Sequence, residues 1–281
     1  MTLLVFGRTG QVATELARRA PDAIYLSRNQ ADLANPAVCA AAIDHHRPTA
    51  VINAAAYTAV DQAEEQEQAA YRVNADAPGA MARACAKHAI PFIQLSTDYV
   101  FDGSGTKPWR PEDPPSPLNA YGRTKLAGEI AVRAPGGTHA IIRTSWVFSA
   151  HGTNFLKGML QLAQSRTELR IVDDQIGGPV HAGDVAAAAL KVAHALRSAP
   201  ENAGTYHFAG LPVASKQDFA AEILDRAGHH IPIHRIATTE WPTPAVRPLN
   251  TRLDCSTFEQ TFGIVQPDWR DGVDSVLREL S

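Results

Sequence analysis

A tyrosine and a lysine stand four residues apart in the stretch YGRTK, as Tyr121 and Lys125. In a helix, that spacing places both side chains on one face. A phenol with its ordinary pKa of about 10 is a poor acid at neutral pH, but a neighbouring ammonium stabilises the phenolate and lowers that pKa. Such a tyrosine could protonate a carbonyl oxygen while hydride arrives at the carbon. A solvent-exposed Tyr–Lys pair is the alternative interpretation.

Two hydroxyl residues, Ser96 and Thr97, directly follow the apolar run Phe92–Leu95. A short apolar run predicts a buried strand, so both hydroxyls fall at its carboxyl end. Ligands of open α/β sheets bind at that edge. A hydroxyl there could hydrogen-bond a reacting carbonyl and hold it for Tyr121. A helix cap or a turn built on the same hydroxyls is the alternative.

A glycine-containing turn opens the chain, with the sequence GRTGQVA from Gly7 to Ala13. It follows the apolar run Leu3–Phe6 and leads into good helix formers from Gln11 onward. Glycines in this context let backbone N–H groups approach a pyrophosphate at the positive end of a helix. The spacing G-x-x-G-x-x-A therefore predicts a dinucleotide site, with a simple turn as the alternative.

The residues that meet the ribose of a dinucleotide should lie about 20 positions later, at the end of the second strand. That strand ends in Leu26-Ser27-Arg28-Asn29, with no acid to accept from a ribose hydroxyl. A guanidinium can pair with a 2′-phosphate, so Arg28 favours NADPH, with NADH as the second choice. Asp32 and Leu33 follow closely enough to contact the adenine. A solvated surface arginine is the alternative for Arg28.

The elements that must position these residues alternate between strands and helices. Apolar runs predict strands over 3–6, 23–26, 50–52, 92–95 and 139–143, and helical patterns cover 11–20, 36–46, 69–88 and 118–133. This alternation predicts an α/β protein with a Rossmann-type, doubly wound parallel sheet. We therefore expect residues 1–150 to form a dinucleotide-binding Rossmann core.

The pattern is looser beyond residue 150. Helices are predicted over 154–164 and 182–196 and from a Ser215 cap to Ala227, with strands over 169–172 and 205–208. Prolines then cluster at positions 232, 242, 244 and 248. We expect residues 151–281 to supply the remaining core elements and a small, interleaved C-terminal substrate-binding lobe, in one continuous globular unit.

Composition excludes several classes of protein. The 281 residues carry 26 basic and 29 acidic side chains, a net charge of −3 that predicts neither a nucleic-acid groove nor a membrane-surface patch. Cys39, Cys85 and Cys255 lie far apart, which is typical of reduced thiols. No apolar run approaches a membrane span and no signal peptide is recognisable, so we expect a cytoplasmic protein with no nucleic-acid or membrane partner.

The order of these motifs resembles the extended short-chain dehydrogenase/reductases. Within that group the chain resembles the family of dTDP-4-dehydrorhamnose reductases, and the matching stretches run almost from end to end. They are FGRTGQV (6–12), NAAAYTAVDQAE (53–64), VN (73–74), STDYVFDG (96–103), NAYGRTKLAGE (119–129), RTSWVF (143–148), DQIGGP (174–179) and RPLNTRLD (247–254).

The resemblance implies roles for individual residues. The catalytic residues are Tyr121, Lys125 and Thr97. The expected dinucleotide contacts are Gly7, Thr9, Gly10, Gln11, Val12, Arg28, Asp32, Leu33, Ala54, Ala55, Ala56, Tyr57, Thr58, Asn74, Ser96, Thr97, Tyr121 and Lys125. The expected substrate contacts are Tyr99, Val100, Trp146, Asn154 and Arg247. An indole face can pack on a pyranose ring and a guanidinium can bind a diphosphate, although an ion pair within the protein is the alternative for Arg247.

The implied reaction is NADPH-dependent reduction of the C4 keto group of dTDP-4-dehydro-β-L-rhamnose to dTDP-β-L-rhamnose, the last step of dTDP-rhamnose synthesis. Two alternatives stay open. One is a sibling reductase that gives the other 4-epimer, such as dTDP-6-deoxy-L-talose. The other is a non-catalytic dinucleotide-binding regulatory subunit, like that of methionine adenosyltransferase.

A metal site is doubtful. Some members of the family bridge dimers with Mg²⁺ through glutamates, and Glu15 and Glu279 occupy matching positions. The third matching position holds Gly183, with Asp184 beside it. Hard cations prefer several oxygen ligands, so we expect no Mg²⁺ requirement and leave monomer and homodimer open.

Overall fold

Six parallel strands form the central sheet of the protein, described for residues 2–281 in a computed structural model. Their order across the sheet is β10-β5-β4-β3-β1-β2, and every neighbouring pair runs parallel. The strands are β1 (Leu3–Phe6), β2 (Ile24–Leu26), β3 (Ala50–Asn53), β4 (Phe92–Thr97), β5 (His139–Thr144) and β10 (Gly204–His207). The chain adds β2 on one side of β1 and β3 on the other, so the crevice at the carboxyl ends of the strands, where ligands bind, lies between β1 and β3.

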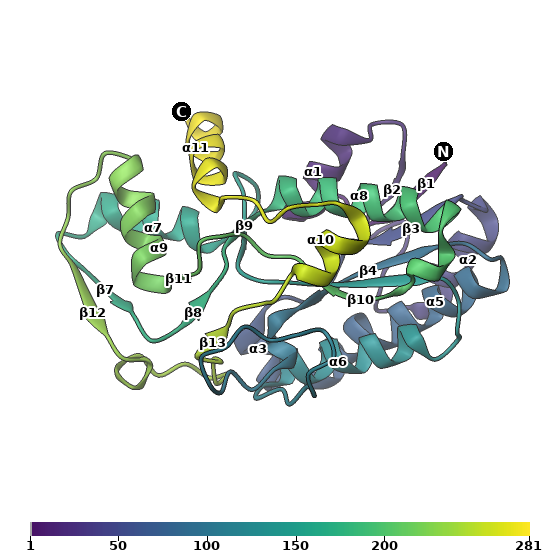
Figure 1. Ribbon diagram of the computed structural model, residues 1–281, viewed down its shortest axis with the longest axis horizontal. Coiled ribbons are helices and arrows are strands. Elements are labelled where there is room, and N and C mark those ends of the chain that lie inside the picture. Colours follow the sequence, from purple (N-terminus) through teal and green to yellow (C-terminus); the bar gives the residue numbers. More distant parts are fainter. Residues whose placement is uncertain (1) are drawn as a thin grey trace.

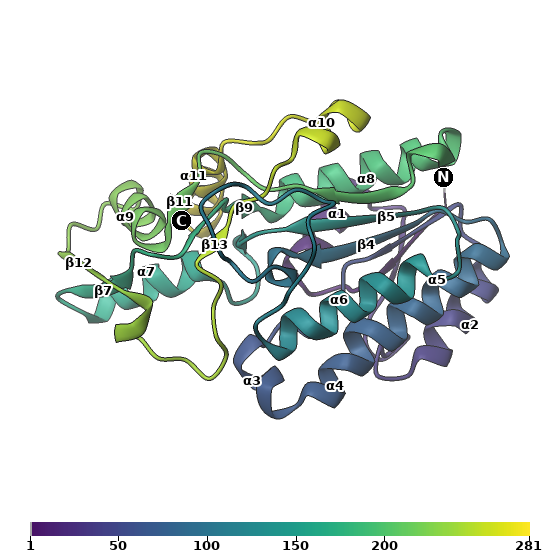
Figure 2. The same cartoon turned by 60° about the horizontal axis from the view of Figure 1, so that its bottom comes forward.

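Helices cover both faces of this sheet, as a doubly wound fold requires. On one face lie α1 (Gln11–Arg19) and α8 (Ala182–Ser198), which pack against each other. Figure 2 shows the opposite face covered by α2 (Pro36–His46), α5 (Ala77–Lys87) and α6 (Ala120–Arg133). The predicted Rossmann-type sheet is thereby confirmed.

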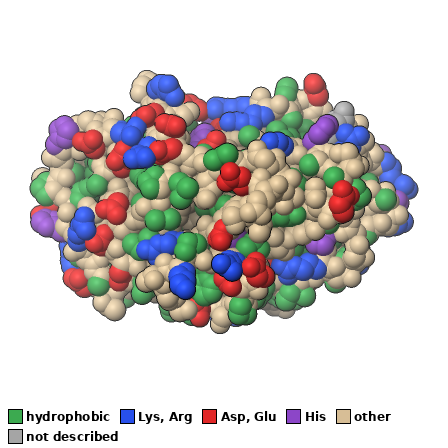
Figure 3. Space-filling model, viewed as in Figure 1, with side chains coloured by type: hydrophobic (Ala, Val, Ile, Leu, Met, Phe, Trp, Pro, Cys, Tyr) green, Lys and Arg blue, Asp and Glu red, His purple; other side chains and the backbone are tan. Residues whose placement is uncertain are grey.

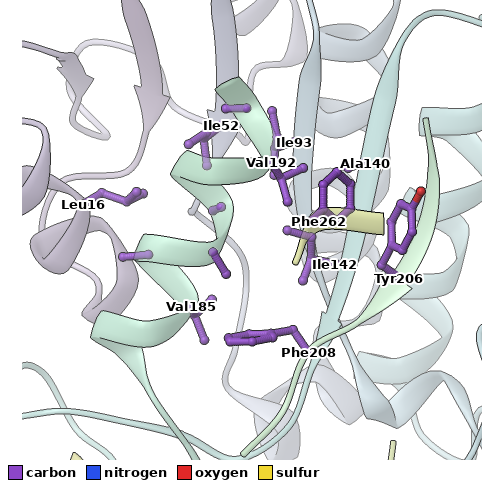
Figure 4. Packing of buried hydrophobic residues seen from close by; sticks show 14 of the residues in the cluster. Leu16, Ile52, Ile93, Ala140, Ile142, Val185, Val192, Tyr206, Phe208 and Phe262 are labelled. Carbon is purple, nitrogen blue, oxygen red and sulfur yellow. The ribbon is translucent and has the colours of Figure 1, made fainter. Parts of the chain in front are cut away.

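Close packing on the α1/α8 face holds the sheet and the helices in register. In Figure 4, Leu16 of α1 points toward α8, whose Val185 belongs to the same cluster, and Ile142 and Phe208 join this cluster from the side of the sheet. All four are buried, so helix α8, from the second half of the chain, completes the core of the first half. Burying side chains of this size contributes about 1.5–3 kcal/mol each.

A smaller lobe extends from the sheet, at the left in Figure 1. Its helices are α7 (Phe155–Ser165), α9 (Lys216–Arg226) and α11 (Trp269–Leu280), packed round a cluster that includes Phe219 and Trp269. Its short strands are β7 (Leu169–Val172), β8 (Ile176–Gly177), β11 (Ala214–Ser215), β12 (Ile233–Ile236) and β13 (Asn250–Thr251). Two further strands, β6 (Val147–Phe148) and β9 (Val180–His181), pair beside the sheet, and α10 (Ser256–Phe262) packs on β10.

One predicted helix differs from the structure. The stretch 69–88 is divided into α4 (Glu67–Tyr71), a π-helical turn over Arg72–Asp76, and α5, with a short α3 (Val60–Glu65) before them. A π turn inserts one extra residue per turn and re-aims its side chains, which periodicity alone does not reveal. In this protein the turn carries Asn74 toward the loop after β3.

Surface and thiols agree with the composition. The face in Figure 3 shows acidic and basic side chains interspersed. The three cysteines are free and buried. Within residues 2–281, no helix combines the length and the apolar character needed to cross a membrane.

Candidate active site

The glycine turn joins β1 to α1 at the crevice edge of the sheet. Gly7 has a φ of 110°, and a Cβ there would lie 3.4 Å from backbone atoms of Ala54, so both conformation and space favour glycine. Gly10 caps α1 without a side-chain hydrogen bond. The N–H groups of the first turn, which lack partners within a helix, are therefore available to an anion. This uncapped helix end fits the pyrophosphate of a dinucleotide.

Side chains from the second half of the chain hold the glycine turn in place through Gln11. The Gln11 amide oxygen accepts from the Ser149 hydroxyl at 2.9 Å and from Asn154 Nδ2 at 3.0 Å. Asn154 also caps α7 by accepting from the backbone N–H of Lys157. Its amide is thus satisfied inside the protein. The structure gives Asn154 the role of a brace for the turn and does not support its predicted role as a substrate contact.

The loop after β3 approaches the same edge and is held by Asn74. Asn74 Oδ1 accepts from the backbone N–H of Tyr57 at 2.8 Å, and its Nδ2 donates to the Tyr57 carbonyl and to Thr124 Oγ1, each at 3.1 Å. Asn74 is buried. It therefore positions the loop 54–58, which contains five of the predicted dinucleotide contacts. A direct contact of Asn74 with the dinucleotide stays a prediction.

The predicted ribose end of the site is open to solvent. Arg28 is exposed just beyond β2, and among the described residues its guanidinium has no hydrogen-bond or ion-pair partner. Asp32 accepts from the backbone N–H of Ala34 at 2.9 Å. The Leu33 side chain packs in the core. An unpaired cation at this point is suited to a phosphate, while Leu33 has no side-chain surface to offer an adenine.

Thr97, Tyr121 and Lys125 meet where β4 ends beside α6. Asn119 caps α6 by accepting from the N–H of Gly122 at 2.8 Å, which fixes the start of the helix at the crevice. A side-chain hydrogen bond joins Tyr121 to Thr97. The Lys125 ammonium donates to the carbonyl of Leu95 at 2.7 Å. The three predicted catalytic side chains therefore form one cluster.

Burial dominates the titration of this cluster. It raises the pKa of the Tyr121 phenol to about 12, against the lowering effect of the hydrogen bond with Thr97. It also lowers the pKa of the Lys125 ammonium to about 8. The net shift of the Tyr121 pKa is therefore upward, so the lowered pKa that the Tyr–Lys spacing predicts is wrong for this structure. Tyr121 is consequently protonated at neutral pH, the state that a proton donor requires.

Ser96 and Thr97 have opposite orientations, as alternation along a strand dictates. The Ser96 hydroxyl donates to the buried carboxylate of Glu129 at 2.6 Å. Glu129 also receives two hydrogen bonds from the fully buried Arg143, at 2.9 and 2.7 Å. The Ser96 hydroxyl therefore belongs to a structural ion-pair network, and a contact of Ser96 with the cofactor stays a prediction.

The predicted substrate residues lie on the lobe side of the cluster. The Tyr99 ring packs edge-on against Tyr121, with centroids 5.8 Å apart. Val100 is fully buried, so its side chain serves the core and not a ligand. Trp146 has a φ of 46°, a left-handed conformation that is rare for a bulky residue. Such strain is concentrated at functional sites.

Arg247 forms an ion pair within the protein. Its guanidinium binds both carboxylate oxygens of Asp61, at 2.9 and 2.8 Å, and thereby ties the segment between β12 and β13 to α3. The structure therefore shows the alternative given for Arg247, an ion pair within the protein. A diphosphate contact by Arg247 remains a prediction, and it would compete with Asp61.

Glu15, His151 and Glu279 lie close enough to offer three ligand atoms to one cation. Arginines already hold both carboxylates, however: Arg19 is bound to Glu15, and Arg18 donates to Glu279 at 2.7 and 2.5 Å. A Cβ on Gly183 would collide with the Arg19 guanidinium. Because a guanidinium stands beside these carboxylates and the donor set is poor in free oxygens, the residues do not fit Mg²⁺.

Two charged side chains at the crevice were missed by the sequence analysis. Asp98 is buried beside Thr97, whose hydroxyl donates to it at 2.8 Å, and Ser145 donates to its other oxygen at 2.8 Å. Burial raises the Asp98 pKa, against the lowering effect of these two bonds. Lys216 reaches the same region from α9. Asp98 stands next to a hydroxyl already singled out, but nothing in the sequence near Lys216 signals a site.

A parallel Rossmann sheet, an uncapped helix end and a Thr–Tyr–Lys cluster define a nicotinamide-dependent oxidoreductase of the short-chain type. Comparison with known proteins narrows the class. The family model described as RmlD substrate binding domain matches residues 1–281. The chain therefore belongs to the RmlD family, and several of its curated relatives are named dTDP-4-dehydrorhamnose reductase.

The similarity extends over whole chains. The dTDP-4-dehydrorhamnose reductase of Sinorhizobium fredii is 42% identical, over 96% of this chain and 95% of its own length. The dTDP-4-dehydrorhamnose reductase of Escherichia coli K12 is 41% identical, over 100% of this chain and 98% of its own length. The crystal structure of the Clostridium acetobutylicum protein has a TM-score of 0.93 at 34% identity, covering 100% of this chain and 99% of that one. A Bacillus anthracis structure in complex with NADP has a TM-score of 0.92 at 30% identity, covering 99% and 100%.

Proposed function

We propose that this protein reduces the C4 keto group of dTDP-4-dehydro-β-L-rhamnose with NADPH, and so forms dTDP-β-L-rhamnose. The observation that carries the proposal is the Thr97–Tyr121–Lys125 cluster at the crevice edge of the sheet. Relatives of at least 40% identity over the full chain bear the name of this activity. The bound dinucleotide supplies a hydride to the carbonyl carbon.

The chain's own residues supply the proton. Tyr121 keeps its proton at neutral pH, because its pKa is raised to about 12 by burial. It gives that proton to the C4 oxygen as negative charge develops there. Thr97 hydrogen-bonds Tyr121 and steadies the phenol for this transfer. With a pKa lowered to about 8 by burial, Lys125 remains largely charged at neutral pH and stabilises the phenolate that is left.

The phosphate turn and the loop after β3 hold the dinucleotide. Backbone N–H groups at the start of α1 receive the pyrophosphate, and Gly7 lets the chain pass close to Ala54. Arg28 would pair with the 2′-phosphate of NADPH. This assignment predicts NADPH over NADH, and among residues 2–281 no carboxylate forms an ion pair with Arg28 that would compete with the phosphate.

The test uses the purified protein, NADPH and enzymatically generated dTDP-4-keto-L-rhamnose, with NMR of the sugar product. We expect NADPH oxidation and dTDP-L-rhamnose as the sugar product. Formation of dTDP-6-deoxy-L-talose would show the sibling reductase instead. NADPH binding without oxidation would show a regulatory dinucleotide-binding subunit and would overturn the proposal.

A further inference from the structure

Lys216 is the first residue of α9 and extends its side chain over Trp146. Its ammonium lies 3.4 Å from the centre of the Trp146 ring and 4.9 Å from that of Phe155. Ser215 caps the helix by a reciprocal bond with Asp218, which fixes where Lys216 begins. The lobe therefore delivers a lysine to the strained tryptophan at the crevice.

Among residues 2–281, no carboxylate or carbonyl pairs with the Lys216 ammonium. The two charged groups that act on it are Asp98 and Arg247. Asp98 already accepts from Thr97 and Ser145, and Arg247 is a second cation bound to Asp61. Burial lowers the Lys216 pKa to about 7, against the raising effect of Asp98 and with a smaller lowering effect of Arg247.

An ammonium held at a partly buried site is destabilising unless it is paired with an anion or a hydrogen-bond acceptor. A cation–π contact stabilises the ammonium by only about 0.5–2 kcal/mol. Arg247 adds like-charge repulsion on the same side of the crevice. This arrangement of two cations is suited to an anion that enters with the ligand.

We propose that Lys216 binds the diphosphate of the nucleotide-sugar substrate. The proposal rests on the proposed function, because the diphosphate is the only anion of that substrate. The four-carbon side chain is flexible enough to exchange the Trp146 face for a phosphate oxygen. If the Lys216 ammonium moved from the indole to the diphosphate, the Trp146 ring would be exposed to the sugar. The contact of Lys216 with the diphosphate and that of Trp146 with the sugar are therefore compatible.

The experiment measures the affinity of the whole protein for dTDP-L-rhamnose by calorimetry, from about pH 6 to about pH 9, on either side of the Lys216 pKa of about 7. The variants are Lys216→Met, Lys216→Arg and a control, Lys191→Met. Lys191 lies on α8, and its exposed ammonium donates to the carbonyl of Gly263 at the end of α10. NADPH affinity and the melting temperature are measured on each.

For Lys216→Met we expect affinity for dTDP-L-rhamnose to fall about 10- to 100-fold, the range that a hydrogen bond to a charged group supplies. NADPH affinity and the Lys191→Met protein should be unchanged. Wild-type affinity should fall as pH rises and the ammonium loses its proton. Lys216→Arg should keep the affinity and remove that fall, since a guanidinium stays charged. Asp98 is present in both wild type and Lys216→Arg, so the difference between their pH profiles of affinity reports on Lys216.

Unchanged affinity of Lys216→Met, or the same pH profile for wild type and Lys216→Arg, would overturn the proposal. Equal losses for dTDP-L-rhamnose and NADPH would show a structural role and overturn it too. A wild-type protein that binds NADPH but not dTDP-L-rhamnose would instead refute the proposed function, and this proposal with it.

Discussion

Lys125 and Lys216 are two lysines at one crevice, and burial lowers the pKa of each, to about 8 and about 7. Lys125 donates to the Leu95 carbonyl, whereas Lys216 rests on an aromatic ring. Lys125 is therefore held in place before any ligand arrives, and Lys216 is not. This difference agrees with the roles proposed above, in which the cluster at the sheet edge serves the chemical step and the lobe side serves binding.

The largest effect on turnover, and so the strictest test of this comparison, is expected for Tyr121→Phe. The change removes one oxygen and keeps the ring that packs on Tyr99. The catalytic constant should fall by about 10²–10⁴, the usual effect of losing a positioned general acid. Fold and NADPH affinity should survive, as checked by steady-state kinetics and calorimetry. A variant that binds NADPH and keeps most of its turnover would mean that another group supplies the proton.

Lys125→Met should lower turnover to a comparable degree by another route, because the ammonium that stabilises the phenolate is lost. We also expect weaker NADPH binding, which distinguishes this variant from Tyr121→Phe. In the wild type, the ammonium loses its proton as pH rises through about 8, so kcat should decline there. A kcat profile that is flat between about pH 7 and about pH 9 would contradict this role.

Thr97→Val removes a hydrogen bond from Tyr121 but leaves the proton donor in place. We expect kcat to fall about 10-fold, the effect of one hydrogen bond. The substrate KM should change less than kcat. If the valine variant is as impaired as Tyr121→Phe, Thr97 does more than steady the phenol.

Arg28 is a third cation, unpaired like Lys216 but exposed to solvent. Arg28→Ala should weaken NADPH binding by about 1–3 kcal/mol, the range for a charge-assisted hydrogen bond, and leave NADH nearly unaffected. Calorimetric titration with both cofactors checks this. Equal losses for the two would show that Arg28 does not recognise the 2′-phosphate.

The smallest effect is expected from removing divalent cations. Arg18 and Arg19 are cations that already have carboxylate partners, Glu279 and Glu15. Adding EDTA should therefore leave turnover unchanged. Loss of activity that Mg²⁺ restores would show that a metal displaces these arginines.

Local sequence determined the sheet and the catalytic pair. Apolar runs and the glycine turn predict β1, α1 and the strands that follow, because hydrophobic periodicity reports directly on burial. A four-residue spacing places Tyr121 and Lys125 on one face whatever surrounds the helix. The motif order and the resemblance it carries give the same family as the full-length comparisons.

Tertiary structure alone decided what each polar group faces. The π turn directs Asn74 to Tyr57, and strand alternation directs Ser96 to Glu129. Asp61 lies 186 residues before Arg247, yet the two bind each other. Lys216 reaches Trp146 only because the lobe folds back on the sheet. Such contacts join segments distant in the sequence, and neither spacing nor composition records them, because the free energy that selects them comes from packing the whole chain.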